Sequence, residues 1–86
     1  MNKMNSILVT GCAGFIGYHL SLSLLKDGVE VLGIDNLNEY YDINLKINRL
    51  SNLQVYKNFI FQKVDIADKE SLSQRFKQFQ PDMVVN

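Results

Sequence analysis

The stretch of sequence that decides the fold covers residues 7–17 and reads ILVTGCAGFIG. It joins a short, continuously apolar run to a glycine-rich turn, and helical apolar spacing follows. A run without polar residues is typical of a strand that is buried on both faces of a parallel sheet. Three glycines, Gly11, Gly14 and Gly17, form the pattern G-x-x-G-x-x-G. The stretch therefore predicts a strand–turn–helix unit.

Each glycine of this turn has its own expected task. Gly11 permits the tight turn, Gly14 lets the backbone approach a pyrophosphate, and Gly17 lets the helix pack closely on the sheet. The helix begins with unpaired N–H groups and the positive end of its dipole, which together bind phosphates. We expect the N–H groups of Phe15 and Ile16 to be the donors. A glycine pattern alone is weak, but its place between a strand and a helix strengthens it.

The remaining apolar patterns alternate between strands and helices. Strands are expected at 29–34 and 59–64 and from residue 83, and Asp68 is a candidate helix cap. Helices are expected at 15–26, at about 42–50, and between Asp68 and Pro81. This order predicts an α/β fold with a parallel, doubly wound sheet in the strand order 3-2-1-4. Only the first half of such a sheet fits in 86 residues, so we expect a truncated domain.

Helical spacing also predicts which side chains face the core. The expected sets are Ile16, Leu20, Leu24 and Leu25 in the first helix, Ile43, Ile47 and Leu50 in the second, and Leu72, Phe76 and Phe79 in the third.

An acidic residue follows the glycine turn at the spacing that is typical of dinucleotide-binding folds. Asp35 lies 18 residues beyond Gly17, at the end of the expected second strand. A carboxylate there accepts hydrogen bonds from the adenosine ribose hydroxyls and repels a 2′-phosphate, which favours NAD over NADP. No Arg or Lys lies between Gly33 and Tyr41 to favour NADP. The alternative is that Asp35 is only a loop carboxylate.

A further candidate cofactor-binding segment follows the third strand. Asp65 ends that strand in the same way as Asp35 ends the second. The Asp65 carboxylate could receive the adenine amino group, with the Ile66 backbone beside it, or it could simply lead into the next helix. Two more residues stay open: Tyr40 and Tyr41 could border the cleft or cover the second helix.

Composition argues against several other classes of protein. Lys+Arg and Asp+Glu both number 9, so no basic stripe indicates nucleic acid. No apolar run approaches the roughly 20 residues that span a membrane. The single cysteine, Cys12, excludes an intrachain disulfide and fits the turn as a small residue, and the only histidine, His19, has no partner for a metal. A cytoplasmic protein without a metal site is the expectation.

Three segments resemble the extended short-chain dehydrogenases/reductases: TGCAGFIG at 10–17, GIDNLN at 33–38 and VDI at 64–66. Within that family, DNLNEYYD at 35–42, followed by NLK and RL, is similar to UDP-glucuronate 4-epimerases. The resemblance covers nearly the whole chain, and its second segment implies that Asn36 and Asn38 lie at cofactor-binding positions around the adenosine. It implies a Rossmann-type domain with NAD, a nucleotide-sugar substrate, and a hydride that is taken from the sugar and returned to its other face. It also implies a homodimeric full-length protein.

The family's catalytic pair, a Tyr with a Lys four residues later, has no match in this chain. None of the four tyrosines has a lysine at that spacing. We therefore expect residues 1–86 to be the N-terminal part of an NAD(P)-binding domain, without catalytic residues and inactive alone. The alternatives are a dehydratase or reductase of the same family, or a stand-alone NAD-binding module. The open sheet edge would let such a short chain self-associate.

Overall fold

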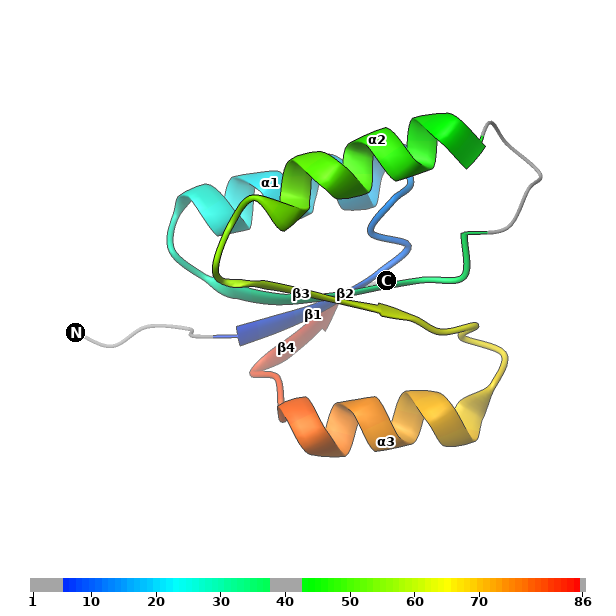
Figure 1. The fold of residues 1–86 in the computed structure, drawn as a ribbon. Coiled ribbons are helices and arrows are strands. Elements are labelled where there is room, and N and C mark those ends of the chain that lie inside the picture. Colours follow the sequence, from blue (N-terminus) through cyan, green and yellow to red (C-terminus); the bar gives the residue numbers. More distant parts are fainter. Residues whose placement is uncertain (1–5, 38–42, 86) are drawn as a thin grey trace.

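The computed structural model of the protein describes residues 6–37 and 43–85. Strands and helices alternate along the chain, as the apolar patterns predict (Figure 1). The elements are β1 (Ser6–Thr10), α1 (Phe15–Lys26), β2 (Glu30–Asp35), α2 (Ile43–Gln54), β3 (Phe59–Lys63), α3 (Lys69–Phe79) and β4 (Met83–Val85). The expected second helix was too short, because α2 continues for four residues beyond Leu50.

The four strands form one parallel sheet in the order β3-β2-β1-β4. The register places Val9 beside Gly33 in β2 and beside Val85 in β4. This confirms the strand order expected for the first half of a doubly wound sheet, and the fold is Rossmann-like. Because all strands are parallel, their carboxyl ends share one edge, which is where ligands bind in open α/β sheets.

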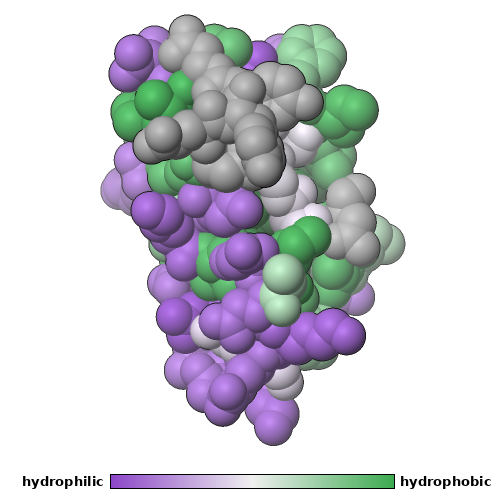
Figure 2. All heavy atoms as spheres, turned by 90° about the vertical axis from the view of Figure 1, so that its right-hand side faces the viewer, coloured by the Kyte–Doolittle hydropathy of each residue, from purple (hydrophilic) through white to green (hydrophobic). Residues whose placement is uncertain are grey.

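The helices cover the two faces of the sheet unequally. Figure 1 shows α1 and α2 together on one face and α3 alone on the other. Packing on the two-helix face buries eight residues: Ile7, Val9, Cys12, Leu25, Val31, Leu50, Leu53 and Phe59. The α3 face buries four: Leu8, Leu32, Ile34 and Val64. Hydrophilic side chains dominate the lower part of Figure 2, where α3 lies in Figure 1.

Two expected core faces, those of the first and third helices, are partly wrong. Ile16 is 78% exposed and Phe76 is 46% exposed, although helical spacing assigned both to the core. The buried residues of α1 are Ser21 and Leu25, and α3 has none. Ile16 lies in the first turn of α1, at the open edge of the sheet, where the described residues place nothing over it. Spacing alone does not reveal that a helix end lies beyond its sheet.

The buried face of α2 is also rotated relative to the expectation. Its buried residues are Lys46, Leu50 and Leu53, whereas Ile47 is 47% exposed. These three also follow helical spacing, so two faces were compatible with the pattern. In the observed rotation Lys46 faces inward in place of Ile47, and it forms an ion pair with Asp35.

Candidate cofactor site

The glycine turn is tied to the end of β2. The N–H groups of Gly11 and Cys12 both donate to the Ile34 carbonyl oxygen, at 2.7 and 3.2 Å, and the Gly14 N–H donates to the Gly11 oxygen at 3.0 Å. Gly11 has a φ of 70°, in the left-handed region where a side chain is strained. The predicted task of Gly11, to allow the tight turn, therefore agrees with its backbone geometry.

Gly17 makes the closest approach of the site. A Cβ at this position would overlap the Gly11 carbonyl oxygen and would lie 2.8 Å from the Gly11 carbonyl carbon and 3.1 Å from Cys12 Cα. We expected glycine here so that the helix could pack on the sheet. The atoms nearest to such a Cβ belong instead to the turn itself, so Gly17 lets α1 start directly against it.

The amino-terminal end of α1 lies open at the carboxyl edge of the sheet. Gly14 is the N-cap residue, and the first turn of the helix holds no acidic side chain. Phe15 is 65% exposed, and Ile16 is more so. The first N–H groups of a helix have no acceptor within it and carry the positive end of the dipole. Phe15 and Ile16 therefore lie at a helix end that favours a negatively charged group.

Asp35 is a buried carboxylate that connects the turn to its own loop. Its Oδ2 accepts a hydrogen bond from the Ala13 N–H at 3.0 Å, and its Oδ1 accepts one from the Leu37 N–H at 2.8 Å. Leu37 has a φ of 54°, which is uncommon for a residue other than glycine. Asp35 thus holds both the glycine turn and a strained residue.

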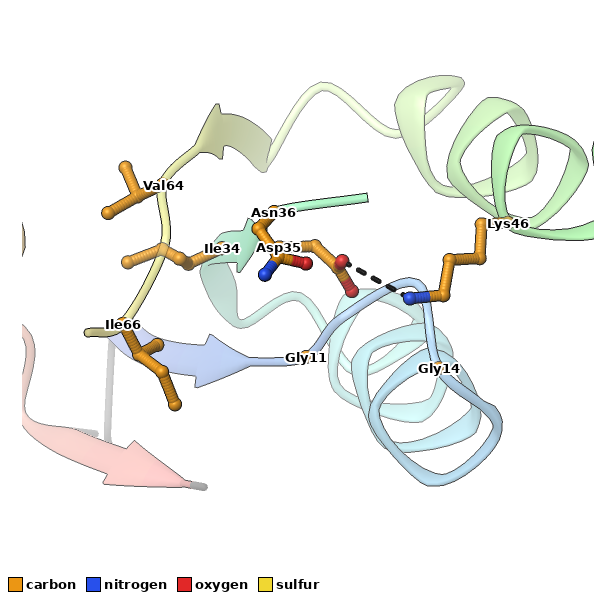
Figure 3. A pocket seen from close by; sticks show the side chains of 8 residues that line it. All are labelled: Gly11, Gly14, Ile34, Asp35, Asn36, Lys46, Val64 and Ile66. Atoms are coloured by element: carbon orange, nitrogen blue, oxygen red, sulfur yellow. Dashed lines mark ion pairs between the residues drawn. The ribbon is translucent and has the colours of Figure 1, made fainter. Parts of the chain in front are cut away.

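Lys46 joins this carboxylate from α2. Its Nζ lies 3.6 Å from Asp35 Oδ1, and the two side chains are 11% and 4% exposed (Figure 3). Sequence reasoning missed this residue because it searched for cations only between Gly33 and Tyr41. The helical spacing of Lys46, Leu50 and Leu53 is compatible with a lysine on the buried face of α2, but it competes with the spacing of the isoleucines.

A cavity of about 220 Å³ opens beside this pair, between the turn and the ends of β2 and β3. Figure 3 shows the residues that line it: Gly11, Gly14, Ile34, Asp35, Asn36, Lys46, Val64 and Ile66. Five of the predicted site residues thus come together here. Apolar side chains and a carboxylate in one cavity suit a flat aromatic base that is joined to a sugar.

A second hollow, of about 370 Å³, shares the glycine turn with the first. It contains three further predicted residues, Phe15, Ile16 and Gly17, and is bordered by Leu20 and Val85. Gly11 and Gly14 line both hollows. The turn and the N-terminus of α1 therefore separate two spaces along the same edge of the sheet.

Asp65 does not line either hollow. Its Oδ1 accepts a hydrogen bond from the Ala67 N–H at 2.9 Å, and its carbonyl oxygen accepts one from the Asp68 N–H at 2.8 Å. These contacts form a turn that leads into α3. Ile66, by contrast, lines the cavity. Asn38, Tyr40 and Tyr41 lie outside the described residues.

Arg49 holds the glycine turn from the same helix as Lys46. Its Nη1 donates to the Ala13 carbonyl oxygen at 3.2 Å, and its guanidinium lies 5.8 Å from the centre of the Phe15 ring. Both ends of Ala13 are therefore bonded, the N–H to Asp35 and the carbonyl to Arg49. Sequence reasoning did not single out Arg49 as a site residue.

Cys12 and His19 have plain structural roles. Cys12 is fully buried, and burial raises the pKa of its thiol from 9.0 to about 12, with a smaller contribution from the Asp35 charge. A thiol that stays protonated is not a nucleophile. The His19 ring packs edge-on against the rings of Phe15 and Tyr18.

Among residues 6–37 and 43–85, no group of metal-ligating side chains occurs, and no helix has the length and apolarity of a membrane span.

Known proteins of one family match this chain in sequence and in fold. A family model described as GDP-mannose 4,6 dehydratase matches residues 8–86. The UDP-glucuronate 4-epimerase of Thermodesulfobacterium geofontis is 43% identical over 83 residues, which is 96% of this chain and 26% of that protein. The chain spans about a quarter of the length of the curated relatives it matches.

Solved structures agree with the sequence matches. The UDP-glucuronic acid 4-epimerase of Bacillus cereus, in complex with NAD, superposes with a TM-score of 0.79 at 38% identity, over 92% of this chain and 25% of that one. The dTDP-glucose 4,6-dehydratase of Bacillus anthracis, also with NAD, gives a TM-score of 0.81 at 28% identity, over 95% and 26%. With the family model matching nearly all of it, the chain belongs to the GDP-mannose 4,6 dehydratase family, within the NAD-dependent epimerases and dehydratases of the extended short-chain dehydrogenase/reductase type.

Proposed function

We propose that this chain binds NAD and forms the front part of a nucleotide-sugar epimerase that acts on UDP-glucuronate at C4. The observation that carries the proposal is the buried Asp35 at the rim of the 220 Å³ cavity, bonded to the glycine turn that begins α1. The residues fit the cofactor, because the cavity pairs apolar walls with one carboxylate and because the glycine turn leads into the open N-terminus of α1.

Each part of the site has a task in this proposal. The cavity takes the adenosine, with Val64 and Ile66 against the base and Asp35 accepting from the ribose hydroxyls. The N–H groups of Phe15 and Ile16 bind the pyrophosphate at the positive end of α1. Bound NAD supplies the hydride acceptor, while the chain's own residues bind and orient it.

The identity of the sugar rests on the relatives. The Bacillus cereus enzyme, which matches at 38% identity, was also solved with UDP-glucuronic acid and NAD. The second candidate is a nucleotide-sugar dehydratase, since the Bacillus anthracis dehydratase has as good a TM-score but only 28% identity. Higher identity to the epimerases favours the first candidate.

We further propose that this stretch alone catalyses no reaction. No tyrosine among its 86 residues is followed four positions later by a lysine. In this proposal, residues 1–86 are the N-terminal part of the NAD-binding domain, and the remaining residues of the whole protein supply the catalytic pair and most of the sugar site. The cytoplasmic location expected from the sequence is part of the same proposal.

Calorimetric titration of the chain with NAD and with NADP tests the cofactor assignment. We expect NAD to bind, NADP to bind clearly more weakly, and Asp35→Ala to reduce the difference, because the variant loses the ribose acceptor and the charge that repels a 2′-phosphate. Circular dichroism of each sample serves as the control for folding. A folded chain that binds neither dinucleotide would overturn the proposal.

The sheet edge at β4 supports a proposal about assembly. β4 is paired with β1 on one side, and in the described residues no strand pairs with its other side. Met83 and Val84 are 47% and 42% exposed. We expect the chain to self-associate through this edge, whereas the whole protein forms a homodimer. Sedimentation of the chain at rising concentration tests this, and a monomer throughout would contradict it.

A further inference from the structure

We propose that cofactor selectivity in this cleft is set by Asp35 and Lys46 together, and that Lys46 is a built-in cation for a 2′-phosphate, which Asp35 masks. The proposal deepens the assignment of NAD and rests on it. Its consequence is specific: a single neutralising substitution at Asp35 should convert the site to NADP binding, and that gain should depend on Lys46.

The two side chains share one place in the cavity. Lys46 Nζ lies 3.6 Å from Asp35 Oδ1, and both residues line the 220 Å³ cavity together with Asn36. Figure 3 shows the lysine reaching from α2 and the aspartate from the end of β2, each pointing toward the other across the glycine turn. A ribose held by Asp35 would therefore place its 2′-oxygen within a few ångströms of a lysine ammonium.

The charges of the pair act on a 2′-phosphate in opposite directions. Such a phosphate carries nearly two negative charges at neutral pH, so a carboxylate beside it is strongly unfavourable. An ammonium at the same distance is favourable, since lysine binds phosphate as a point charge. Both side chains are nearly buried, so water screens neither interaction much. The repulsion by Asp35 and the attraction by Lys46 therefore partly cancel.

Because the two charges oppose each other, the presence of Lys46 changes the expected effect of neutralising Asp35 on NADP binding. Without a nearby cation, removing the carboxylate would end the repulsion but would offer the 2′-phosphate nothing to bind. With Lys46 present, the same change removes the opposing carboxylate charge and leaves the ammonium charge beside the phosphate. In the natural chain Lys46 instead compensates the buried charge of Asp35, since a buried carboxylate without a partner is costly.

Four forms of the chain separate these effects: the natural sequence, Asp35→Asn, Lys46→Met, and the double variant. The double variant is central, because it removes both charges and leaves no uncompensated ion in the cavity. Lys57→Met serves as the matched control, since Lys57 is an exposed lysine in the turn before β3, at the opposite end of the strand from the cavity. Dissociation constants for NAD and NADP are measured by calorimetry at low and at moderate salt, with circular dichroism for each form.

The expected pattern is a gain that depends on the lysine. Asp35→Asn should shift the ratio of NADP to NAD affinity toward NADP by at least about tenfold. Adding Lys46→Met to it should weaken NADP about tenfold while NAD changes less than about threefold. NADP binding to Asp35→Asn should fall with salt more than NAD binding does, because only NADP brings a charged 2′-phosphate from the solvent to the Lys46 ammonium. Lys57→Met should leave every ratio unchanged.

Two results would overturn the inference without touching the cofactor assignment. One is a double variant that binds NADP as well as Asp35→Asn does. The other is an Asp35→Asn variant that binds NAD but gains nothing for NADP. If the natural chain is folded and binds neither dinucleotide, the proposed function fails and this inference fails with it. Should Lys46→Met alone unfold the chain, the comparison of Asp35→Asn with the double variant still decides.

Discussion

The two faces of the sheet differ in how tightly helices pack on them. On the α1–α2 face, residues of the turn, α1 and α2 join those of the strands in the core, and two of them, Cys12 and Leu53, are fully buried. On the α3 face, every buried residue comes from a strand or directly follows one, and α3 contributes none. A hollow of about 190 Å³ between α3 and the sheet is lined by Leu32, Arg75 and Phe79 among others.

This difference shows where the geometry of the site is determined. The candidate site is positioned from α2 and from the glycine turn, through the contacts of Asp35, Lys46 and Arg49. Side chains in a close-packed region keep one arrangement, whereas loosely covered regions open at low free-energy cost. The tight face therefore positions the candidate site, and α3 covers the other side of the sheet.

Truncating a side chain on each face should show the largest difference. Leu53→Ala removes a fully buried side chain on α2 and should lower the free energy of unfolding by about 3 kcal/mol. Phe76→Ala removes a side chain of α3 that is 46% exposed and should cost less than about 1 kcal/mol. Urea unfolding, followed by circular dichroism, measures both. Equal losses would mean that the two faces are packed alike.

The thiol of Cys12 reports on the same tight face. Because its pKa is raised to about 12 by burial, alkylation near pH 8 should be at least about a hundredfold slower in the folded chain than in urea. The folded pKa lies above the ordinary value of 9.0, so the stabilising contribution of the buried neutral thiol is complete below pH 9 and is lost as the pH rises toward 12. Equal alkylation rates with and without urea would show that this face opens readily.

A substitution of Arg49 tests whether α2 positions the glycine turn. Arg49→Met removes the donor to the Ala13 carbonyl and the contact with Phe15, and should weaken NAD binding by about fivefold to tenfold. Adenosine binding should change little, because adenosine lacks the pyrophosphate that the turn would hold. Arg49→Lys should restore part of the affinity for NAD. Arg75→Met, on α3, is the matched control, and an equal loss for NAD and adenosine would contradict a positioning role.

Local sequence predicted most of the fold because each element carries its own signal. The glycine turn, the apolar run before it and the αL residue Gly28 after α1 are all short-range features. The strand order followed from the alternation of strands and helices together with the place of the glycine turn. The rotation of α2 could not be predicted, because two faces of the helix both follow helical spacing. One is Ile43, Ile47 and Leu50, and the other is Lys46, Leu50 and Leu53. Tertiary contacts such as the ion pair of Lys46 with Asp35 and the burial of Leu53 distinguish the two faces.

The candidate site divides in the same way. Gly11, Gly14, Asp35, Asn36 and Ile66 could be predicted, since a motif or the end of a strand marks each, and all line one cavity. Lys46 and Arg49 could not, because a lysine and an arginine on a helix usually face solvent. Their roles depend on how α2 crosses the turn, which is a tertiary feature. The turn that Asp65 forms with Ala67 before α3 is likewise visible only in the structure.

The smallest expected effect concerns the cap of α3. Asp68 Oδ1 accepts from the Ser71 N–H at 3.2 Å, and its Oδ2 accepts from the Ser71 hydroxyl at 2.9 Å. Because α3 buries no side chain, its stability should depend strongly on this local cap. The stability of α1 should not, since Gly14 at its start makes no side-chain cap bond. Asp68→Ala should therefore speed amide hydrogen exchange in α3 and leave exchange in α1 and α2 unchanged.

The pH dependence of this cap gives a second measurement. The hydrogen bonds from the Ser71 backbone and hydroxyl lower the pKa of Asp68 below its ordinary value of 3.8. A lowered folded pKa means that the cap stabilises α3 fully above that ordinary value and loses its effect as the pH falls through the folded pKa. Asp68→Asn keeps an acceptor without the charge, so its exchange rates in α3 should not show this dependence. Equally faster exchange in α1 and α3 of the Asp68→Ala variant would contradict the prediction. It would show that α3 does not open independently of the rest of the chain.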